Sequence, residues 1–178
     1  MQTHRFDPAL RDEMSRLLPR ILRFARSLTR DSAAAEDLVQ NAYMKAVEGL
    51  AQFTPGTRLD SWMFKIVQNT WIDEKRRAQR AGNVISLQDA RDAGMPVQGH
   101  GGSDRVFLRA ALAALPTDQR SALTLVLIEG YSYREAAEIL KVPDGTVMSR
   151  VARARRALVE LHDADHAVPP CDIKRGTP

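Results

Sequence analysis

Apolar residues recur every three or four positions along most of the chain, and this spacing predicts amphipathic helices. Asp31 and Ser32 are suited to cap one of these helices, and Pro55 and Gly56 predict a loop before the next. No stretch alternates between apolar and polar residues as a half-buried strand would. The helical pattern covers residues 14–28, 32–50, 60–77, 104–114, 117–129, 132–140 and 146–162.

The helical pattern is interrupted once, and the interruption predicts the domain organisation. Residues 79–103 contain five glycines and no sustained period, which is typical of a flexible linker. We therefore expect an all-α fold of two small helical domains, at residues 8–78 and 104–162, followed by a frayed tail at residues 163–178. A chain of 178 residues has room for two such domains, each with a modest core.

The positive charge of the chain is concentrated in one segment. The net charge is +4, and residues 141–156 alone hold five basic side chains and one acid. The rest of the chain has 21 residues of each sign and is neutral overall. Such a distribution is typical of a surface that binds a polyanion, although a solvated basic helix face is the alternative.

Several classes of protein are disfavoured by the composition. A single cysteine, Cys171, rules out an intramolecular disulfide framework and is consistent with a reducing compartment. No run of about 18 apolar residues is present, so membrane insertion is not expected. The first residues, MQTHRFDPALRDEM, are too polar for a secretory signal, and we expect a cytoplasmic protein.

No catalytic, cofactor or metal site is expected. His162 and His166 lie near Asp163, Asp165 and Cys171, but in a segment that we expect to be frayed. The chain has no glycine-rich phosphate loop after a strand and no acid pair in an evident pocket. Neither an enzymatic activity nor a small-molecule substrate is therefore expected.

The charged segment follows the pattern of a helix-turn-helix. Ser132 and Glu135 form an S-x-x-E capping box that fixes the start of the first helix. Ala137 is small where two helices would cross, and Val147 lies ten residues later on the apolar side of the second. A helix in this second position enters the major groove of DNA. Its exposed face would carry Met148, Ser149, Ala152, Arg153 and Arg156.

A helix in the first domain has a composition suited to unpaired nucleic acid. Trp62 and Trp71 lie on it, and it ends in a basic cluster at residues 75–80. Aromatic rings stack on bases while basic groups hold the backbone, as single-strand binding requires. The alternative is that either tryptophan is simply a core anchor.

Three blocks of this sequence resemble one family in the same order. GYSYREAAEILKVPDGTVMSRVARARRAL resembles region 4 of the extracytoplasmic-function sigma factors, the small initiation subunits of bacterial RNA polymerase. AEDLVQNAYMKAV and SWMFKIVQNTWIDEKRR are similar to region 2 of the same family. The resemblance covers roughly residues 15–160, and it is more specific than a helix-turn-helix match alone.

The resemblance implies that region 4 reads the upstream (−35) promoter element in duplex DNA. Met148 stands where the family often has a basic residue, so we expect apolar contact there, for example with a thymine methyl group. Lys141 stands where many helix-turn-helix motifs have glycine, which predicts a slightly strained turn. The residues that match the upstream-element surface are Arg134, Met148, Ser149, Arg150, Ala152, Arg153 and Arg156, with Arg150 and Arg156 nearer to phosphates.

The resemblance also implies two tasks for region 2. One is to hold the downstream (−10) element, with Asn69 and Asp73 at an extruded base. The other is to dock on core RNA polymerase through the solvent face of the helix at residues 32–50. The matching downstream residues are Trp62, Lys65, Asn69, Asp73, Lys75, Arg76 and Arg77, and the docking residues are Asp37, Gln40, Asn41 and Met44.

The expected partners are therefore core RNA polymerase, promoter DNA in duplex and single-stranded form, and an anti-sigma factor of the kind that usually holds this family. One alternative is a conventional helix-turn-helix regulator that binds duplex DNA alone as a dimer. Another is an anti-sigma partner or mimic, against which the basic recognition helix argues, because a mimic needs no DNA-binding face.

Overall fold

The computed structural model describes residues 8–29, 31–50, 53, 54, 56–81 and 104–166, and all regular structure among them is helical. This confirms the expected all-α fold. The helices are α1 (Pro8–Leu28), α2 (Ser32–Glu48), α3 (Leu59–Arg80), α4 (Asp104–Ala114), α5 (Thr117–Leu123), the π-helical turn η3 (Thr124–Ile128), α6 (Tyr133–Leu140) and α7 (Asp144–His166).

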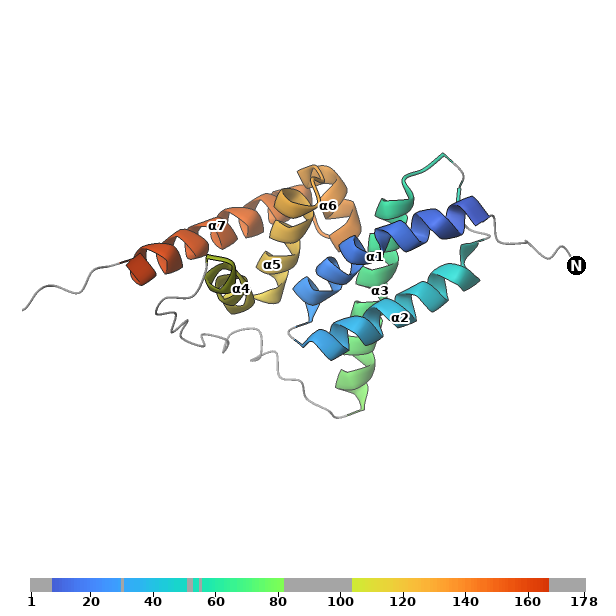
Figure 1. Cartoon of the computed structure of the whole chain (residues 1–178), viewed down its shortest axis with the longest axis horizontal. Coiled ribbons are helices and arrows are strands. Elements are labelled where there is room, and N and C mark those ends of the chain that lie inside the picture. The colour runs from blue at the N-terminus through green and yellow to red at the C-terminus, as the bar shows by residue number, and fades with distance from the viewer. Residues whose placement is uncertain (1–7, 30, 51–52, 55, 82–103, 167–178) are drawn as a thin grey trace, which may run out of the picture.

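Helices α1, α2 and α3 pack together as a first group, on the right of Figure 1. Asp31 caps α2 as expected, because its carboxylate accepts a hydrogen bond of 2.8 Å from the Ala34 amide. The Tyr43 hydroxyl donates to the Met14 carbonyl at 2.7 Å and ties α2 to α1. The apolar stripes of the three helices meet in a core that includes Ile21, Leu38 and Val67.

Helices α4 to α7 form a second group, in which the long α7 lies along α5 and α6 (Figure 1). A small core of Leu115, Leu123 and Ala154 joins α5 to α7. Within the described residues, no helix combines the length and apolar character that a membrane span requires.

The helix expected at residues 117–129 differs from the prediction in its second half. Its last turn is π-helical, with the Glu129 amide donating to the Thr124 carbonyl, five residues back, at 3.0 Å. Gly130 then reverses the chain with a φ of +76°, a conformation that favours glycine. The wider turn changes the direction of the Glu129 side chain, which points at α1.

Two helices run past their expected ends. α3 continues to Arg80, and α7 continues to His166, beyond the residue 162 at which we expected the second domain to end. Residues 82–103 of the expected linker and residues 167–178 of the expected tail lie outside the described residues.

The two groups of helices pack against each other, which the sequence did not predict. α1 lies against α5 and η3, and α3 lies against α6. Phe64 of α3 makes edge-to-face contacts with Phe24 of α1, at 5.1 Å between ring centroids, and with Tyr131 of the second group, at 5.5 Å. These three rings and the neighbouring Glu129 are here called the intergroup contact. The rings belong to one apolar core cluster that includes residues of both groups.

Because Phe64 is fully buried between the groups, Phe64→Ala should destabilise both at once. We expect a loss of about 3–5 kcal/mol in the free energy of unfolding, from lost transfer energy and the cavity left behind. Urea denaturation followed by circular dichroism measures this loss. Leu108→Ala, at an exposed position of α4, is the control and should cost no more than about 0.5 kcal/mol. Equal effects of the two substitutions would contradict the packing described.

Candidate nucleic-acid interface

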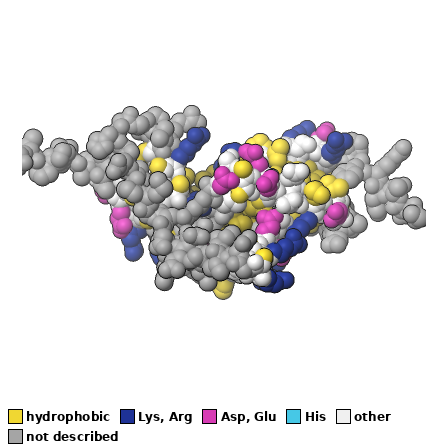
Figure 2. Space-filling view, turned by 90° about the horizontal axis from the view of Figure 1, so that it is seen from below, with side chains coloured by type: hydrophobic (Ala, Val, Ile, Leu, Met, Phe, Trp, Pro, Cys, Tyr) yellow, Lys and Arg dark blue, Asp and Glu magenta, His cyan; other side chains and the backbone are white. Residues whose placement is uncertain are grey.

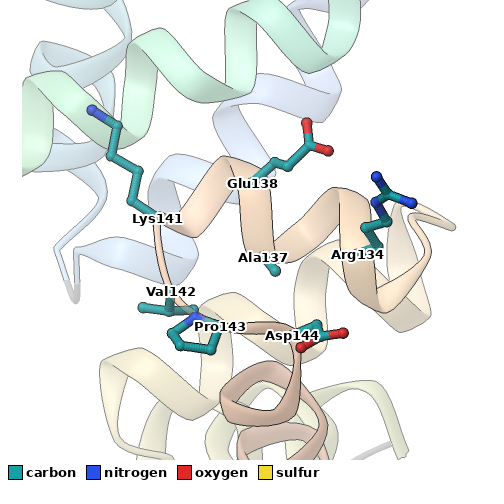
Figure 3. Close-up of a pocket in the computed structure, with 7 residues that line it drawn as sticks. All are labelled: Arg134, Ala137, Glu138, Lys141, Val142, Pro143 and Asp144. Carbon is teal, nitrogen blue, oxygen red and sulfur yellow. The ribbon is translucent and has the colours of Figure 1, made fainter.

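The turn between α6 and α7 has the geometry of a helix-turn-helix. Ser132 and Glu135 form the expected capping box: the Ser132 hydroxyl accepts from the Glu135 amide at 3.2 Å, and the Glu135 carboxylate accepts from the Ser132 amide at 2.9 Å. Lys141 ends α6 in the left-handed conformation, with φ 56°, as its place in the motif predicts. The turn borders a hollow of about 530 Å³ (Figure 3), lined by Arg134, Ala137, Glu138, Lys141, Val142, Pro143 and Asp144.

Helix α7 has one buried side and one exposed side. Val147, Val151 and Ala154 are buried against the rest of the second group, as their spacing predicts. The side chains that we expected to face DNA are exposed, and Met148 among them has 53% of its surface accessible. Arg153 donates to the Ser149 carbonyl at 3.2 Å, so its side chain lies back along its own helix by one turn. The exposed set is Met148, Ser149, Ala152, Arg153 and Arg156, joined by Arg134 on α6.

Arg150 is placed differently from the others. Successive residues of a helix are rotated by about 100°, so Arg150 lies only about 60° from the buried Val147. Its guanidinium pairs with the Asp118 carboxylate at 3.2 Å, and its side chain is only 21% exposed. The geometry gives Arg150 a role in fastening α7 to the start of α5, and the structure does not present it with the exposed set.

Helix α3 carries the second candidate surface. Asn69 and Asp73 are half-buried on one side of the helix, and Lys75, Arg76 and Arg77 are exposed at its end. Figure 2 shows Lys and Arg side chains gathered on this part of the underside of the molecule. Lys65, Asn69 and Arg76 lie within about 40° of one another around the helix axis. Six of the seven expected downstream residues lie within an arc of about 120° around α3, whereas Lys75 lies on the side of Trp71.

The two tryptophans are both half-buried. Trp62 packs against Phe53 with 5.3 Å between ring centroids. Trp71 lies under the Lys75 ammonium, which is 4.5 Å from the ring centroid. Each ring thus contacts the protein on one side and keeps part of its surface accessible.

Several of the expected site residues already have polar partners in the chain. Lys45 lies 3.4 Å from the Asp73 carboxylate, and the Asn41 amide donates to Glu74 at 2.9 Å. The Lys65 ammonium donates to Glu138 of α6 at 3.1 Å. Pairs on the surface contribute little energy and exchange readily for a ligand. The Lys65 pair is different in kind because it joins the two groups of helices.

The solvent face of α2 combines acidic and apolar side chains. Asp37, Gln40 and Asn41 are exposed, and Met44 has 56% of its surface accessible. Val47 of the same helix is also exposed and lies one turn from Met44. Acidic and hydrophobic side chains mix over this half of the underside in Figure 2. An exposed methionine and valine among polar residues are typical of a protein-docking face rather than of a nucleic-acid surface.

A cluster of charges beside the intergroup contact was missed by the sequence analysis. Arg20 donates to Asp60 at 3.1 Å and to Glu129 at 2.7 Å, and Arg58 donates to Asp60 at 3.0 and 3.2 Å. The Tyr131 hydroxyl is buried beside Asp60 but finds no hydrogen-bond partner of good geometry among the described residues. No local spacing could reveal this cluster, because its members come from α1, α3 and the second group.

The cluster perturbs the titration of its members. Burial by itself would raise the pKa of Asp60, but hydrogen bonds, chiefly from Arg58, outweigh it and lower that pKa to about 2. Burial and then the Asp60 charge raise the pKa of Tyr131 above its ordinary value. Asp60 therefore stays ionised and Tyr131 stays neutral over the whole physiological range.

Among the residues that the structure describes, no three His, Cys, Asp or Glu side chains are grouped in a way that could hold a metal ion.

Because its pKa is lowered in the folded state, Asp60 should stabilise the fold above pH 4, and this contribution should be lost as the pH falls toward 2. Asp60→Asn should therefore cost about 2 kcal/mol at pH 7, and the difference from the wild type should shrink with acidification. Denaturant unfolding of both proteins at a series of pH values measures this difference in the free energy of unfolding. Asp12→Asn, at an exposed position of α1, is the control and should change the free energy of unfolding little at any pH. A difference that does not depend on pH would contradict this account of the cluster.

Comparison with known proteins identifies both halves of the chain. Residues 14–81 match the family profile of Sigma-70 region 2, and residues 108–158 match that of Sigma-70 region 4. The first group of helices thus corresponds to region 2 and the second group to region 4.

This chain is also similar to other proteins over most of its length. The chain is 35% identical over 167 residues to the ECF RNA polymerase sigma factor EcfG of Rhodopseudomonas palustris (strain TIE-1), covering 89% of this chain and 88% of the relative. It is also similar to the sigma factor RpoE of Bartonella quintana, solved in complex with the anti-sigma factor NepR, with 35% identity and a TM-score of 0.70. This match covers 88% of this chain and 98% of the solved chain. CnrH, solved with the cytosolic domain of CnrY, is 28% identical with a TM-score of 0.60. The match covers 88% of this chain and 89% of the CnrH structure's chain.

These matches span both helical groups and most of the length of the relatives. The helix-turn-helix and the aromatic, basic helix α3 lie within the matched regions. This chain belongs to the extracytoplasmic-function (ECF) family of RNA polymerase sigma factors.

Proposed function

We propose that this chain binds core RNA polymerase in the bacterial cytoplasm, recognises the −35 and −10 promoter elements and promotes promoter opening. The proposal rests on the presence of two different helices in one chain. Helix α7 of the helix-turn-helix is suited to reading duplex DNA, and the aromatic and basic helix α3 is suited to single strands. A regulator that reads duplex DNA alone would need only the first of these.

The upstream element is read in the major groove by the exposed side of α7. Arg153 supplies a planar fork of donors that matches a guanine edge or a phosphate. Met148 and Ala152 offer apolar contact, which suits the methyl group of thymine. Arg134 and Arg156 lie at the edges of this surface and hold phosphates, whereas Arg150 holds α7 against Asp118.

The downstream element is held as a single strand along α3. Asn69 and Asp73 contact an extruded base, with Trp62 beside them as a stacking surface. Lys65, Lys75, Arg76 and Arg77 hold the phosphates. The free energy of melting is offset by stacking and by these contacts, so the chain needs neither a nucleotide cofactor nor a catalytic group of its own.

The exposed face of α2 docks on the polymerase. Asp37 and Gln40 offer polar contacts, and Met44 adds an adaptable apolar contact. Asn41 takes part after releasing Glu74, to which it is hydrogen-bonded in the free chain. A docking face on α2 leaves the exposed side of α7 and the end of α3 available for DNA.

An anti-sigma factor keeps the chain silent until a signal releases it. The support for this is the likeness to RpoE and CnrH, whose structures were solved in complex with NepR and with the cytosolic domain of CnrY. A stress or another signal that removes the inhibitor would then start transcription of a specific set of genes.

The division of labour between α3 and α7 predicts different defects for two substitutions. Arg153→Ala should weaken duplex binding of the reconstituted holoenzyme by roughly 10- to 100-fold, because a base or phosphate contact is lost. Asn69→Ala should leave duplex binding nearly unchanged and reduce open-complex formation about tenfold. Gel-shift and permanganate footprinting assays on genomic promoter fragments separate the two steps.

Arg16→Ala, which removes an exposed charge from α1, is the matched control and should affect neither step. A chain that ignores core polymerase yet binds a duplex site alone, as a dimer, would overturn the proposal in favour of a conventional helix-turn-helix regulator.

A further inference from the structure

Three glutamates of region 4 face the basic side chains of region 2. Glu129, at the end of η3, accepts hydrogen bonds of 2.7 Å from both Arg20 and Arg23 of α1. Only 1% of the Glu129 side chain is exposed, so water has little access to the carboxylate that the two guanidinium groups bind. Charge-assisted bonds of this kind are about twice as strong as neutral ones.

The other two glutamates lie on α6. Glu135 accepts from Arg58 at 2.7 Å, and Glu138 accepts from Lys65 of α3 at 3.1 Å. In Figure 3 the side chain of Glu138 projects from α6 on the side of the neighbouring α3. The three carboxylates thus follow one border between the regions, from α1 to the middle of α3.

The charges across this border are matched. On region 2 the four cations Arg20, Arg23, Arg58 and Lys65 and the one acid among them, Asp60, sum to a net charge of +3. The three glutamates of region 4 carry −3 against it. A surface with this excess of arginine and lysine is attractive to phosphates, and carboxylate oxygens occupy the same donor groups that phosphate oxygens would.

One of these cations belongs to the single-strand surface already described. Lys65 shares its face of α3 with Asn69 and Arg76, and in this arrangement it is held by Glu138. A strand that follows α3 past Asn69 would reach Lys65 and continue toward Arg58. Region 4 therefore lies over one end of the path that the downstream strand would take.

The packing of α6 on α3 also conflicts with reading both promoter elements. Elements centred at −35 and −10 are about 85 Å apart along B-form DNA, at about 3.4 Å per base pair. Two packed helices have axes only about 8–10 Å apart. Because α6 leads directly into α7, the regions have to separate before α7 and α3 can both reach their elements.

We propose that this closed arrangement inhibits the chain by itself, with Glu129, Glu135 and Glu138 standing in for phosphates on a further nucleic-acid surface made by Arg20, Arg23, Arg58 and Lys65. This inference rests on the proposed function, since it extends the single-strand surface of α3. Opening exposes the four cations and allows a DNA strand to replace the glutamates. An inhibitor that binds both regions then acts on a state that the chain already favours.

The test compares two variants with the same change in charge. Glu129→Gln/Glu135→Gln/Glu138→Gln keeps the side-chain shapes, and glutamine is still compatible with the capping box. Asp12→Asn/Glu13→Gln/Glu160→Gln removes three exposed acids elsewhere and is the control. Small-angle X-ray scattering of the purified full chain reports opening, and fluorescence anisotropy with a labelled 20-nucleotide single strand reports affinity.

We expect the first variant to show a larger radius of gyration and to bind the strand at least about tenfold more tightly than the wild type. The control should stay compact and gain no more than about threefold, from its net charge alone. Adding Arg20→Ala/Arg23→Ala to the first variant should reduce its gain in affinity, because two of the four uncovered cations are then missing. Should the buried Glu129 prove essential for folding, Glu135→Gln/Glu138→Gln tests the two surface pairs alone, with Asp12→Asn/Glu13→Gln as its control.

Equal scattering curves and equal affinities for the two triple variants would overturn the proposal. Opening without a gain in affinity would also contradict it, because the uncovered cations would then not bind nucleic acid. The scattering measurement needs no polymerase, so a failure of this proposal is distinguishable from a failure of the proposed function, which core binding tests.

Discussion

The structure depends on one buried contact between its two halves. Phe64 lies between Phe24 and Tyr131 with edge-to-face contacts, and the three rings are bordered by Glu129, which pairs with two arginines. The rings supply apolar burial, and the charges fix the register of region 4 on region 2, since an unpaired buried carboxylate would be costly. The positions of α6 on α3 and of α5 on α1 follow from this contact.

The contact makes one set of cations serve two purposes. In the closed chain Lys65 and Arg58 stabilise the fold through Glu138 and Glu135, and in the proposed open chain they hold DNA. Surface pairs such as these are weak enough to exchange, whereas the pair around Glu129 is shielded from water. A chain built in this way can be compact when free and still open when polymerase and promoter together offer more contacts.

Local features of the sequence predicted most of the helices and much of the candidate site. The capping box at Ser132 and the left-handed Lys141 depend on residues within one or two turns, so their sequence signals were sufficient. The packing of region 2 on region 4 could not be predicted, because Phe64 and Tyr131 are 67 positions apart and no local period connects them. The π-helical turn that directs Glu129 toward α1, and the pairing of Arg150 with Asp118, likewise arise from tertiary contacts that override the helical pattern.

The most direct test of this account is the distance between the two regions, with the charges across their border unchanged, as the chain binds its partners. Spin labels on cysteines at Ala33 of α2 and Val159 of α7, both exposed, with Cys171→Ser, report that distance by pulsed electron paramagnetic resonance. The account predicts a single narrow distribution for the free chain, replaced by a much longer distance once core RNA polymerase and promoter DNA are added. A broad or long distribution in the free chain would contradict it, because the two regions would then already be separate.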